Sequence, residues 1–144
     1  MSVDLFIDSN VFIYQLDIRD PRKHAIADRI VGEALAAENA CISFQVIQEC
    51  LNTMLRKAEI TLDPVTTRLY LDTVLAPLHR VPSSLGLYRG ALGLQRRWKF
   101  SFYDALIVAA ALEAGCKHLL SEDLQHGQRI GSLRIENPFR NSTR

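Results

Sequence analysis

The sequence predicts an α/β protein in which helices cover both faces of a short, mostly parallel sheet. The main observation is that short apolar runs of strand type alternate with longer segments whose apolar residues recur at helical spacing. Such alternation is typical of parallel strands joined by helices. The chain has 144 residues, about the length of one domain, and its 48% hydrophobic content suits a folded core rather than a disordered segment.

The first third of the chain predicts two strands and two helices. Residues 3–7 are a short apolar run, and Asp8-Ser9-Asn10 after it are residue types that begin helices. Asp20-Pro21 is expected to begin a second helix, because Asp caps helices and Pro suits their first turn. The apolar residues that continue this helix are Ile26, Ile30, Val31 and Leu35. Residues 41–44 predict the second strand.

Two more helices are expected next. Ser43 is the expected N-cap of a helix whose apolar stripe occupies residues 46–55. Asp63-Pro64 is expected to begin another helix, which runs through Leu75 and ends near Pro77 because proline interrupts a helix interior.

The last part of the chain continues the alternation. Residues 79–81 predict a brief strand, and the apolar period of residues 84–98 predicts a helix. Residues 102–114 form a nearly all-apolar helix stopped by Gly115, which we expect to be buried on most sides. The remaining predicted strands are residues 117–121 and 133–135.

Composition argues against several classes of protein. The longest apolar run, residues 105–112, is much shorter than the roughly 20 residues of a membrane-spanning helix. The N-terminus Met1-Ser2-Val3-Asp4 lacks the basic and apolar regions of a secretory signal, so we expect a cytoplasmic protein with no membrane association. Cys41, Cys50 and Cys116 are odd in number and lack paired spacing, which argues against a disulfide framework or a zinc site.

Charge is nearly balanced overall but unevenly distributed. The chain has 17 Lys+Arg against 16 Asp+Glu, a net charge of +1, which identifies no partner. No acidic residue lies between Asp72 and Asp104. The basic residues of that stretch are Arg80, Arg89, Arg96, Arg97 and Lys99. Because no acid offsets them, this stretch predicts a local basic face.

Four carboxylates stand near predicted strand ends or helix starts, and each alone has an ordinary explanation. Asp8 follows the first strand and is of a type that caps helices. Ser101 and Asp104 fit a capping box before the apolar helix. Asp123 follows a strand in a position suited to a turn, and Glu49 alone suits a solvated helix face.

Considered together, the four carboxylates predict a metal site. In parallel α/β sheets, ligands bind outside the carboxyl ends of the strands, where these acids are expected to converge. Ionised carboxylates within about 4–6 Å of one another raise each other's pKa, so such a cluster needs a cation. Oxygen ligands suit Mg²⁺ or Mn²⁺. The sequence has no phosphate-binding glycine loop, and Gly86, Gly90 and Gly93 look like close-packing positions on a helix.

Four short motifs stand in order along nearly the whole chain. They are Asp8-Ser9-Asn10 with Tyr14, Gln48-Glu49 in a helix after Ser43, residues 102–111, and Ser121-Glu122-Asp123. In this order they resemble the motifs of PIN-domain ribonucleases, and more closely those of the VapC-type toxin branch. Residues 119–127 and 134–139 are similar to one subgroup of these toxins, in which Gln125 stands where others often have an aromatic residue.

The resemblance implies a three-layer α/β/α PIN-like fold as a single domain over residues 1–144, with a polar tail from about residue 140. It implies metal-dependent endonucleolytic cleavage of RNA, with Mg²⁺ or Mn²⁺ as cofactor. By position, the catalytic acids are Asp8, Glu49, Asp104 and Asp123, of which Asp8, Asp104 and Asp123 hold metal. Asn10 and Ser121 would hydrogen-bond to these carboxylates. Toxins of this family form dimers and are neutralised by a small cognate antitoxin.

The expected reaction is metal-assisted phosphodiester hydrolysis. One ion held by Asp8 and Asp104 would lower the pKa of a water, and a second ion about 3.5–4 Å away would stabilise the leaving oxygen. Glu49 or Asp123 would accept the proton of the water or complete the metal coordination. The sequence does not separate these two roles.

RNA phosphates approaching an acidic pocket need cations beside it. The candidate RNA-binding residues are Arg89, Arg96, Arg97 and Lys99, for which a solubilising helix face is an equal alternative. Trp98 and Phe100 lie among them and either stack on bases or pack in the core.

Two other hypotheses remain. The first is a catalytically inactive PIN-like module that binds RNA or protein, against which the complete set of acids argues. The second is a receiver-like phosphotransfer domain, which predicts a pair of acids after the first strand. Asp8 stands there with Ser9 and Asn10 instead, so this hypothesis is disfavoured.

Overall fold

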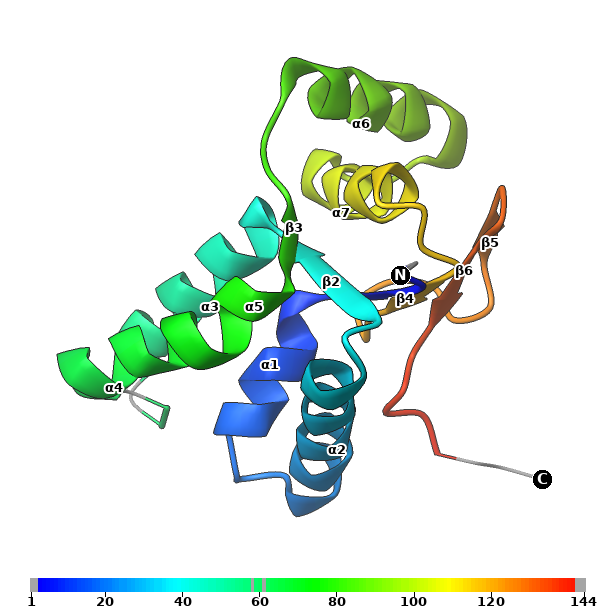
Figure 1. The fold of residues 1–144 in the computed structure, drawn as a ribbon. Helices are drawn as coiled ribbons and strands as arrows, with labels where there is room; N and C mark the ends of the chain where they lie inside the picture. The colour runs from blue at the N-terminus through cyan, green and yellow to red at the C-terminus, as the bar shows by residue number, and fades with distance from the viewer. Residues whose placement is uncertain (1–2, 58, 61, 142–144) are drawn as a thin grey trace.

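Within residues 3–57, 59–60 and 62–141, which the computed structural model describes, six short strands form one sheet (Figure 1). Their order across the sheet is β3-β2-β1-β4-β6-β5. They are β1 (Leu5–Ile7), β2 (Ala40–Ser43), β3 (His79–Val81), β4 (His118–Leu120), β5 (Arg129–Ile130) and β6 (Leu133–Glu136). Neighbouring strands are parallel except β5 and β6, so the predicted mostly parallel sheet is confirmed. Residues 142–144 of the predicted polar tail lie outside the described residues.

Helices cover both faces of the sheet and complete the predicted three-layer α/β/α arrangement (Figure 1). On one face lies α7 (Phe102–Glu113), with α6 (Leu85–Trp98) on its outer side. The other face carries α1 (Ser9–Leu16), α2 (Pro21–Ala37) and α3 (Phe44–Arg56). Beside α3 lie α4 (Pro64–Tyr70), a π-helical turn η1 (Leu71–Leu75) and α5 (Ala76–Leu78), which leads into β3. None of the described helices is long and apolar enough to cross a membrane.

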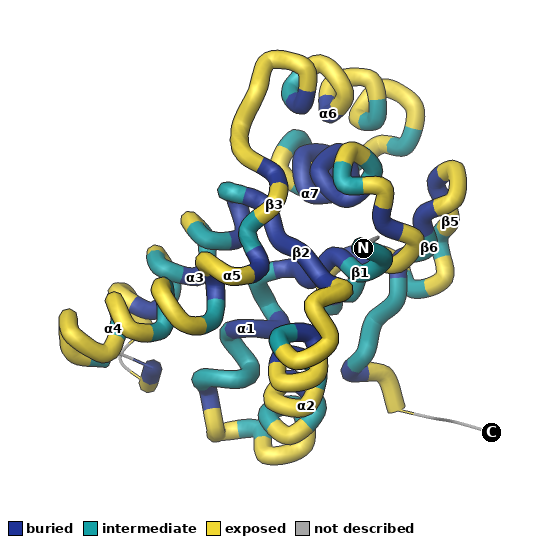
Figure 2. The backbone as a smooth tube through the Cα atoms, viewed as in Figure 1, coloured by how far each residue is buried: buried dark blue, intermediate teal, exposed yellow. Residues whose placement is uncertain are grey.

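The core runs through the centre of the sheet and along α7 (Figure 2). Phe6 and Ile7 of β1 are fully buried, and so are all four residues of β2, as expected for strands covered on both faces. In α7 the consecutive residues 105–111 are all buried, because this helix lies between the sheet and α6. The prediction of a helix buried on most sides is therefore confirmed.

The local sequence explains where several helices begin. The side chain of Asp20 accepts a hydrogen bond from the Lys23 backbone N–H at 3.1 Å, and that of Ser84 accepts one from the Leu87 backbone N–H at 3.0 Å. Both residues are N-caps of the expected type. Ser43 is the N-cap of α3 by position, as predicted, although its side chain makes no capping hydrogen bond.

The structure differs from the sequence-based expectation in two places. The strand β5 was not predicted, because a two-residue strand is too short to show a period; it is formed by a hairpin through Gly131 at φ +60. The helix predicted from Asp63-Pro64 to near Pro77 ends at Leu78, as expected, but it is divided into α4, the π-helical turn η1 and α5. Pro77 lies in the first turn of α5, where its missing N–H is tolerated.

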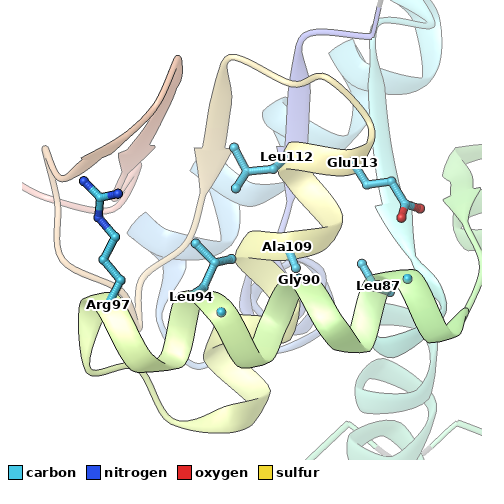
Figure 3. Close-up of a pocket in the computed structure, with 9 residues that line it drawn as sticks. Leu87, Gly90, Leu94, Arg97, Ala109, Leu112 and Glu113 are labelled. Carbon is cyan, nitrogen blue, oxygen red and sulfur yellow. The ribbon is translucent and has the colours of Figure 1, made fainter.

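A groove with a cavity volume of about 500 Å³ runs between α6 and α7 (Figure 3). Leu87, Leu94 and Leu112 line it. Of the three glycines predicted to be close-packing positions, only Gly90 faces the neighbouring helix, with Ala109 Cβ 3.9 Å from the position of an added Cβ. The prediction is wrong for Gly93, where an added Cβ meets nothing within 4 Å, and for Gly86, which faces only the side chain of Ser84.

Candidate active site

Asp8 lies at the end of β1, at the carboxyl edge of the sheet, and is 5% exposed. Its backbone N–H donates to the carbonyl of Leu120 at 3.0 Å, which holds the ends of β1 and β4 together. One carboxylate oxygen accepts the Ser9 backbone N–H at 2.7 Å, so Asp8 is the N-cap of α1. The other accepts the Ser121 hydroxyl at 2.7 Å. Asp8 is therefore a helix cap, and it can also belong to a functional site.

Burial determines the protonation of Asp8. Removal from water raises the pKa of Asp8 to about 6, because the loss of solvation outweighs the hydrogen bonds from Ser121 and Ser9. The negative charges of Glu49 and Asp123 raise this pKa further. The pocket therefore holds a carboxylate that is poorly stabilised by the protein alone.

Glu49 is held from two sides. One carboxylate oxygen accepts the Ser9 hydroxyl at 2.9 Å, and the other accepts Nε2 of Gln45 at 3.0 Å. The same Nε2 donates to the backbone carbonyl of Tyr103 at 3.2 Å, which connects α3 to the start of α7 next to Asp104. The Glu49 carboxylate is thus oriented by α1 and by its own helix.

Sequence reasoning missed Gln45 as part of the site. The residue is buried, at 3% exposure, and lines the same pocket as Glu49. A signal was present, because Gln45 precedes Glu49 by four residues and so lies on the same face of α3. The sequence indicates Ser9 only as part of the Asp8-Ser9-Asn10 motif and not as the residue that holds Glu49.

Asp104 and Asp123 approach the pocket from two further segments. Asp104 is half-buried in the first turn of α7, where its backbone N–H donates to the Ser101 hydroxyl at 3.2 Å, one half of the predicted capping box. Asp123 is exposed in the turn after β4 and accepts Nδ2 of Asn10 at 3.2 Å. The backbone N–H of Asp123 donates to the Ser121 hydroxyl at 3.2 Å, so Ser121 bonds to both Asp8 and this turn.

The structure brings all four predicted acids to one pocket of about 280 Å³. The residues lining it are Asp8, Ser9, Gln45, Glu49, Asn52, Thr53, Asp104, Ile107 and Asp123. They meet because β1, β2 and β4 are adjacent parallel strands that end at the same edge, where α3 and α7 begin. Asn10 and Ser121 hydrogen-bond to the carboxylates, as the sequence predicts.

The chemistry of the pocket fits a divalent cation. Its lining has four carboxylates and no Lys, Arg or His, and converging negative charges repel unless a cation lies among them. No three His, Cys, Asp or Glu side chains in the described part of the chain form a group that holds a metal directly, so Asp8, Asp104 and Asp123 share the pocket without forming one. Mg²⁺ suits this arrangement, because it commonly binds one or two carboxylates and keeps several waters.

The predicted RNA-binding residues lie along and just after α6. All four are exposed: Arg89, Arg96, Arg97 and Lys99. None of them lines the acidic pocket; Arg97 lines the α6–α7 groove instead, with its guanidinium 5.3 Å from the centre of the Trp98 ring. Trp98 and Phe100 are half-buried and pack against the core, which favours the core-packing alternative for both.

One known protein family matches the sequence. The sequence model of the PIN domain matches residues 5–129. No curated protein matches the sequence significantly.

Solved structures share the fold at low sequence identity. VapBC2 from Rickettsia felis, crystallised with a DNA fragment from its promoter, is 18% identical with a TM-score of 0.65, covering 94% of this chain and 98% of that one. A toxin–antitoxin complex from Klebsiella pneumoniae is 18% identical with a TM-score of 0.63 and the same coverage. VapC20 from Mycobacterium tuberculosis, described as a sarcin–ricin loop cleaving toxin, is 20% identical with a TM-score of 0.58, covering 81% and 87%.

Proposed function

The chain belongs to the PIN domain family, and from this membership and the acidic pocket we propose that it is a metal-dependent endoribonuclease acting as the toxin of a toxin–antitoxin pair. The observation that carries the proposal is the meeting of Asp8, Glu49, Asp104 and Asp123 in one pocket. The structural relatives support it, since one is described as a sarcin–ricin loop cleaving toxin and another is a toxin–antitoxin complex.

The acids have separate tasks in this proposal. Asp8, Asp104 and Asp123 would hold Mg²⁺ or Mn²⁺, directly or through water. When bound, such an ion would supply an activated water for attack on phosphorus and would neutralise charge on the phosphate. Glu49 is the candidate to take the proton of that water, because Ser9 and Gln45 hold its carboxylate in place at the pocket. Asn10 and Ser121 keep Asp123 and Asp8 oriented.

The RNA-binding part of the proposal makes a prediction about salt. Replacing both Arg96 and Arg97 by Ala should weaken binding of single-stranded RNA to a similar degree for all sequences, because phosphate contacts carry no base information. If both side chains contact phosphate, the slope of log affinity against log salt should become shallower by about 1.4. Fluorescence anisotropy of a labelled RNA at several salt concentrations measures both effects.

The matched control removes the same charge elsewhere. Arg29 of α2 and Arg68 of α4 are also exposed, so replacing both by Ala changes the net charge equally without touching α6. An unchanged affinity and slope in the Arg96/Arg97 variant, or equal changes in the control, would show that α6 presents only a solubilising face.

Two protein partners belong to the proposal: a small cognate antitoxin and a second copy of the chain as a homodimer. Toxin–antitoxin complexes among the structural relatives support the antitoxin. Exposed apolar side chains on α3 and α4, namely Leu55, Val65 and Leu69, supply apolar surface for either partner.

The proposed activity is tested by cleavage of a mixed RNA pool with purified protein. Cutting is expected with Mg²⁺ or Mn²⁺ and absent with EDTA. Asp104→Asn, which keeps the shape of the side chain but removes its charge, should lower the rate at least about a hundredfold, more than the loss of a group that only supports a metal ligand. Asp72→Asn, a change of an exposed acid on η1, is the matched control and should leave the rate unchanged.

Two other outcomes have clear meanings. Cleavage that persists in EDTA would contradict the metal-dependent mechanism. Absence of cleavage by the folded wild type under all conditions, with RNA still bound, would favour a catalytically inactive module that binds RNA.

A further inference from the structure

A cluster of four side chains lies next to the acidic pocket, and none of them has a part in the proposed reaction. It consists of Tyr14 from α1, Lys23 from α2, Glu122 from the turn after β4, and Phe139 near the C-terminal end of the described chain. We call these four residues the Glu122 clamp. It connects segments that are far apart in the sequence, since Glu122 is 108 residues from Tyr14 and 99 from Lys23.

Both carboxylate oxygens of Glu122 are held. The Tyr14 hydroxyl donates to Oε1 at 2.6 Å, and the Lys23 ammonium donates to Oε2 at 2.5 Å. The Lys23 ammonium also donates to the Tyr14 hydroxyl at 3.2 Å, so the three polar groups form a closed triangle. Glu122 therefore has little freedom to leave this position.

The clamp is better shielded from water than an ordinary surface ion pair. The side chains of Lys23 and Glu122 are only 26% and 24% exposed. The Lys23 ammonium lies 4.8 Å from the centre of the Tyr14 ring and 6.0 Å from that of Phe139, and the two rings pack 4.8 Å apart. Reduced solvent contact and two aromatic faces strengthen the hold on the charged pair relative to an exposed one.

Glu122 is the middle residue of the segment 121–123, which also carries Ser121 and Asp123. Glu122 stands between Ser121, which donates to Asp8, and Asp123. Its backbone N–H donates to Oδ1 of Asn10 at 3.2 Å, and Nδ2 of the same Asn10 donates to Asp123. The side chains of Glu122 and Asn10 therefore both hold this turn, Glu122 through Tyr14 and Lys23, and Asn10 through the Glu122 backbone and the Asp123 carboxylate.

Asp123 has particular need of such support. It is the only exposed residue among the four acids, and it lies in a turn rather than in a helix or strand. A ligand on an unsupported turn loses conformational freedom when it binds a cation, and this lowers the affinity of the site. A turn held in advance avoids that loss.

We propose that the Glu122 clamp positions Asp123 for the divalent cation, with Lys23, Tyr14 and Glu122 as positioning residues that touch neither substrate nor metal. The proposal rests on the proposed function in one respect: Asp123 is taken to serve a cation. It identifies three residues whose loss should change the cation affinity of the folded protein from outside the pocket.

The test measures Mn²⁺ affinity by isothermal titration calorimetry, together with hydrogen–deuterium exchange of residues 121–125 without metal. Glu122→Gln and Lys23→Met should each weaken Mn²⁺ binding about tenfold, as outer supports of metal ligands commonly do. Both should speed exchange in residues 121–125. Lys23→Arg keeps a cation that can pair with Glu122, so it should restore most of both losses.

The matched control is Arg19→Met. Arg19 also forms an ion pair with an acid in the α1–α2 region, since it donates to Asp17 at 2.7 Å. Neither Arg19 nor Asp17 belongs to the Glu122 clamp. This variant should leave the Mn²⁺ affinity and the exchange of residues 121–125 unchanged. It also reports how far the loss of a neighbouring ion pair changes stability alone.

The outcomes separate this proposal from the proposed function. Lower melting temperatures in the clamp variants with unchanged Mn²⁺ affinity and unchanged exchange would overturn the clamp proposal. They would show that these residues only stabilise the fold. A wild type that binds Mn²⁺ but cuts no RNA would overturn the nuclease proposal, while weaker Mn²⁺ binding in the clamp variants would still support the clamp. Equal losses in Lys23→Met and Lys23→Arg would also contradict it.

Discussion

Replacement of Asp8 by Asn is expected to lower RNA cleavage at least about a thousandfold, because the change removes a charged ligand from the most buried position of the cation site. The same change is expected to make the metal-free protein more stable at pH 7.5. A variant that loses activity and gains stability would identify Asp8 as a residue kept for function at the expense of the fold.

The sign of the stability effect follows from the pKa of Asp8. Folding raises this pKa from 3.8 to about 6, so the folded protein holds the proton more tightly than the unfolded chain does. Stability from this residue is therefore fully present below about pH 4 and is lost as the pH rises through 6. At neutral pH the ionised Asp8 costs the folded state about 3 kcal/mol. Asn is a good N-cap for α1 and carries no charge, so it removes most of this cost.

Urea denaturation in EDTA at pH 5 and pH 7.5 measures the effect. We expect Asp8→Asn to exceed the wild type by about 1–3 kcal/mol at pH 7.5, and this advantage to be about 1.4 kcal/mol smaller at pH 5. Asp17→Asn is the control of opposite sign: hydrogen bonds from Arg19 lower the pKa of Asp17 to about 2, so loss of that charge should destabilise the protein at neutral pH. If both variants lose stability equally at pH 7.5, the cost assigned to Asp8 is wrong.

The parts of the fold that the sequence predicts are those that depend on local pattern. Alternating apolar runs predict the parallel sheet, and an Asp8-Ser9-Asn10 segment directly after a strand predicts both a helix start and an acid at the sheet edge. Pattern fails at β5, whose two residues are in a strand only because Gly131 lets the chain turn back onto β6.

The supporting contacts of the site are not predictable in the same way. Ser9 holds Glu49 across two helices, and Gln45 reaches the Tyr103 carbonyl across the interface of α3 and α7. Such contacts depend on how helices separated by 40 or more residues pack, which no local period encodes. For the same reason, the run of basic residues predicts an exposed helix face but not its position relative to the pocket.

Mn²⁺ is expected to stabilise the wild type, with an effect that depends on pH. At a concentration one hundred times the dissociation constant, a ligand that binds only the folded state adds about 2.7 kcal/mol, which corresponds to a rise in Tm of about 8–10 °C for a chain of this length. At the same Mn²⁺ concentration the rise should be smaller at pH 5, because a proton on Asp8, whose pKa is about 6, must leave before the carboxylate can serve as a ligand.

Differential scanning calorimetry with and without Mn²⁺ at both pH values tests this competition. One unit below the pKa of Asp8, the proton weakens Mn²⁺ binding about tenfold and removes about 1.4 kcal/mol of the stabilisation. Asp8→Asn has no proton to displace at this position, so any remaining rise in Tm should lose that part of its pH dependence. A rise of equal size in wild type and variant at both pH values would show that Mn²⁺ binds outside the acidic pocket. A rise confined to the wild type and larger at pH 7.5 would place the ion on Asp8, because the raised pKa of this carboxylate links its proton to metal binding in this range.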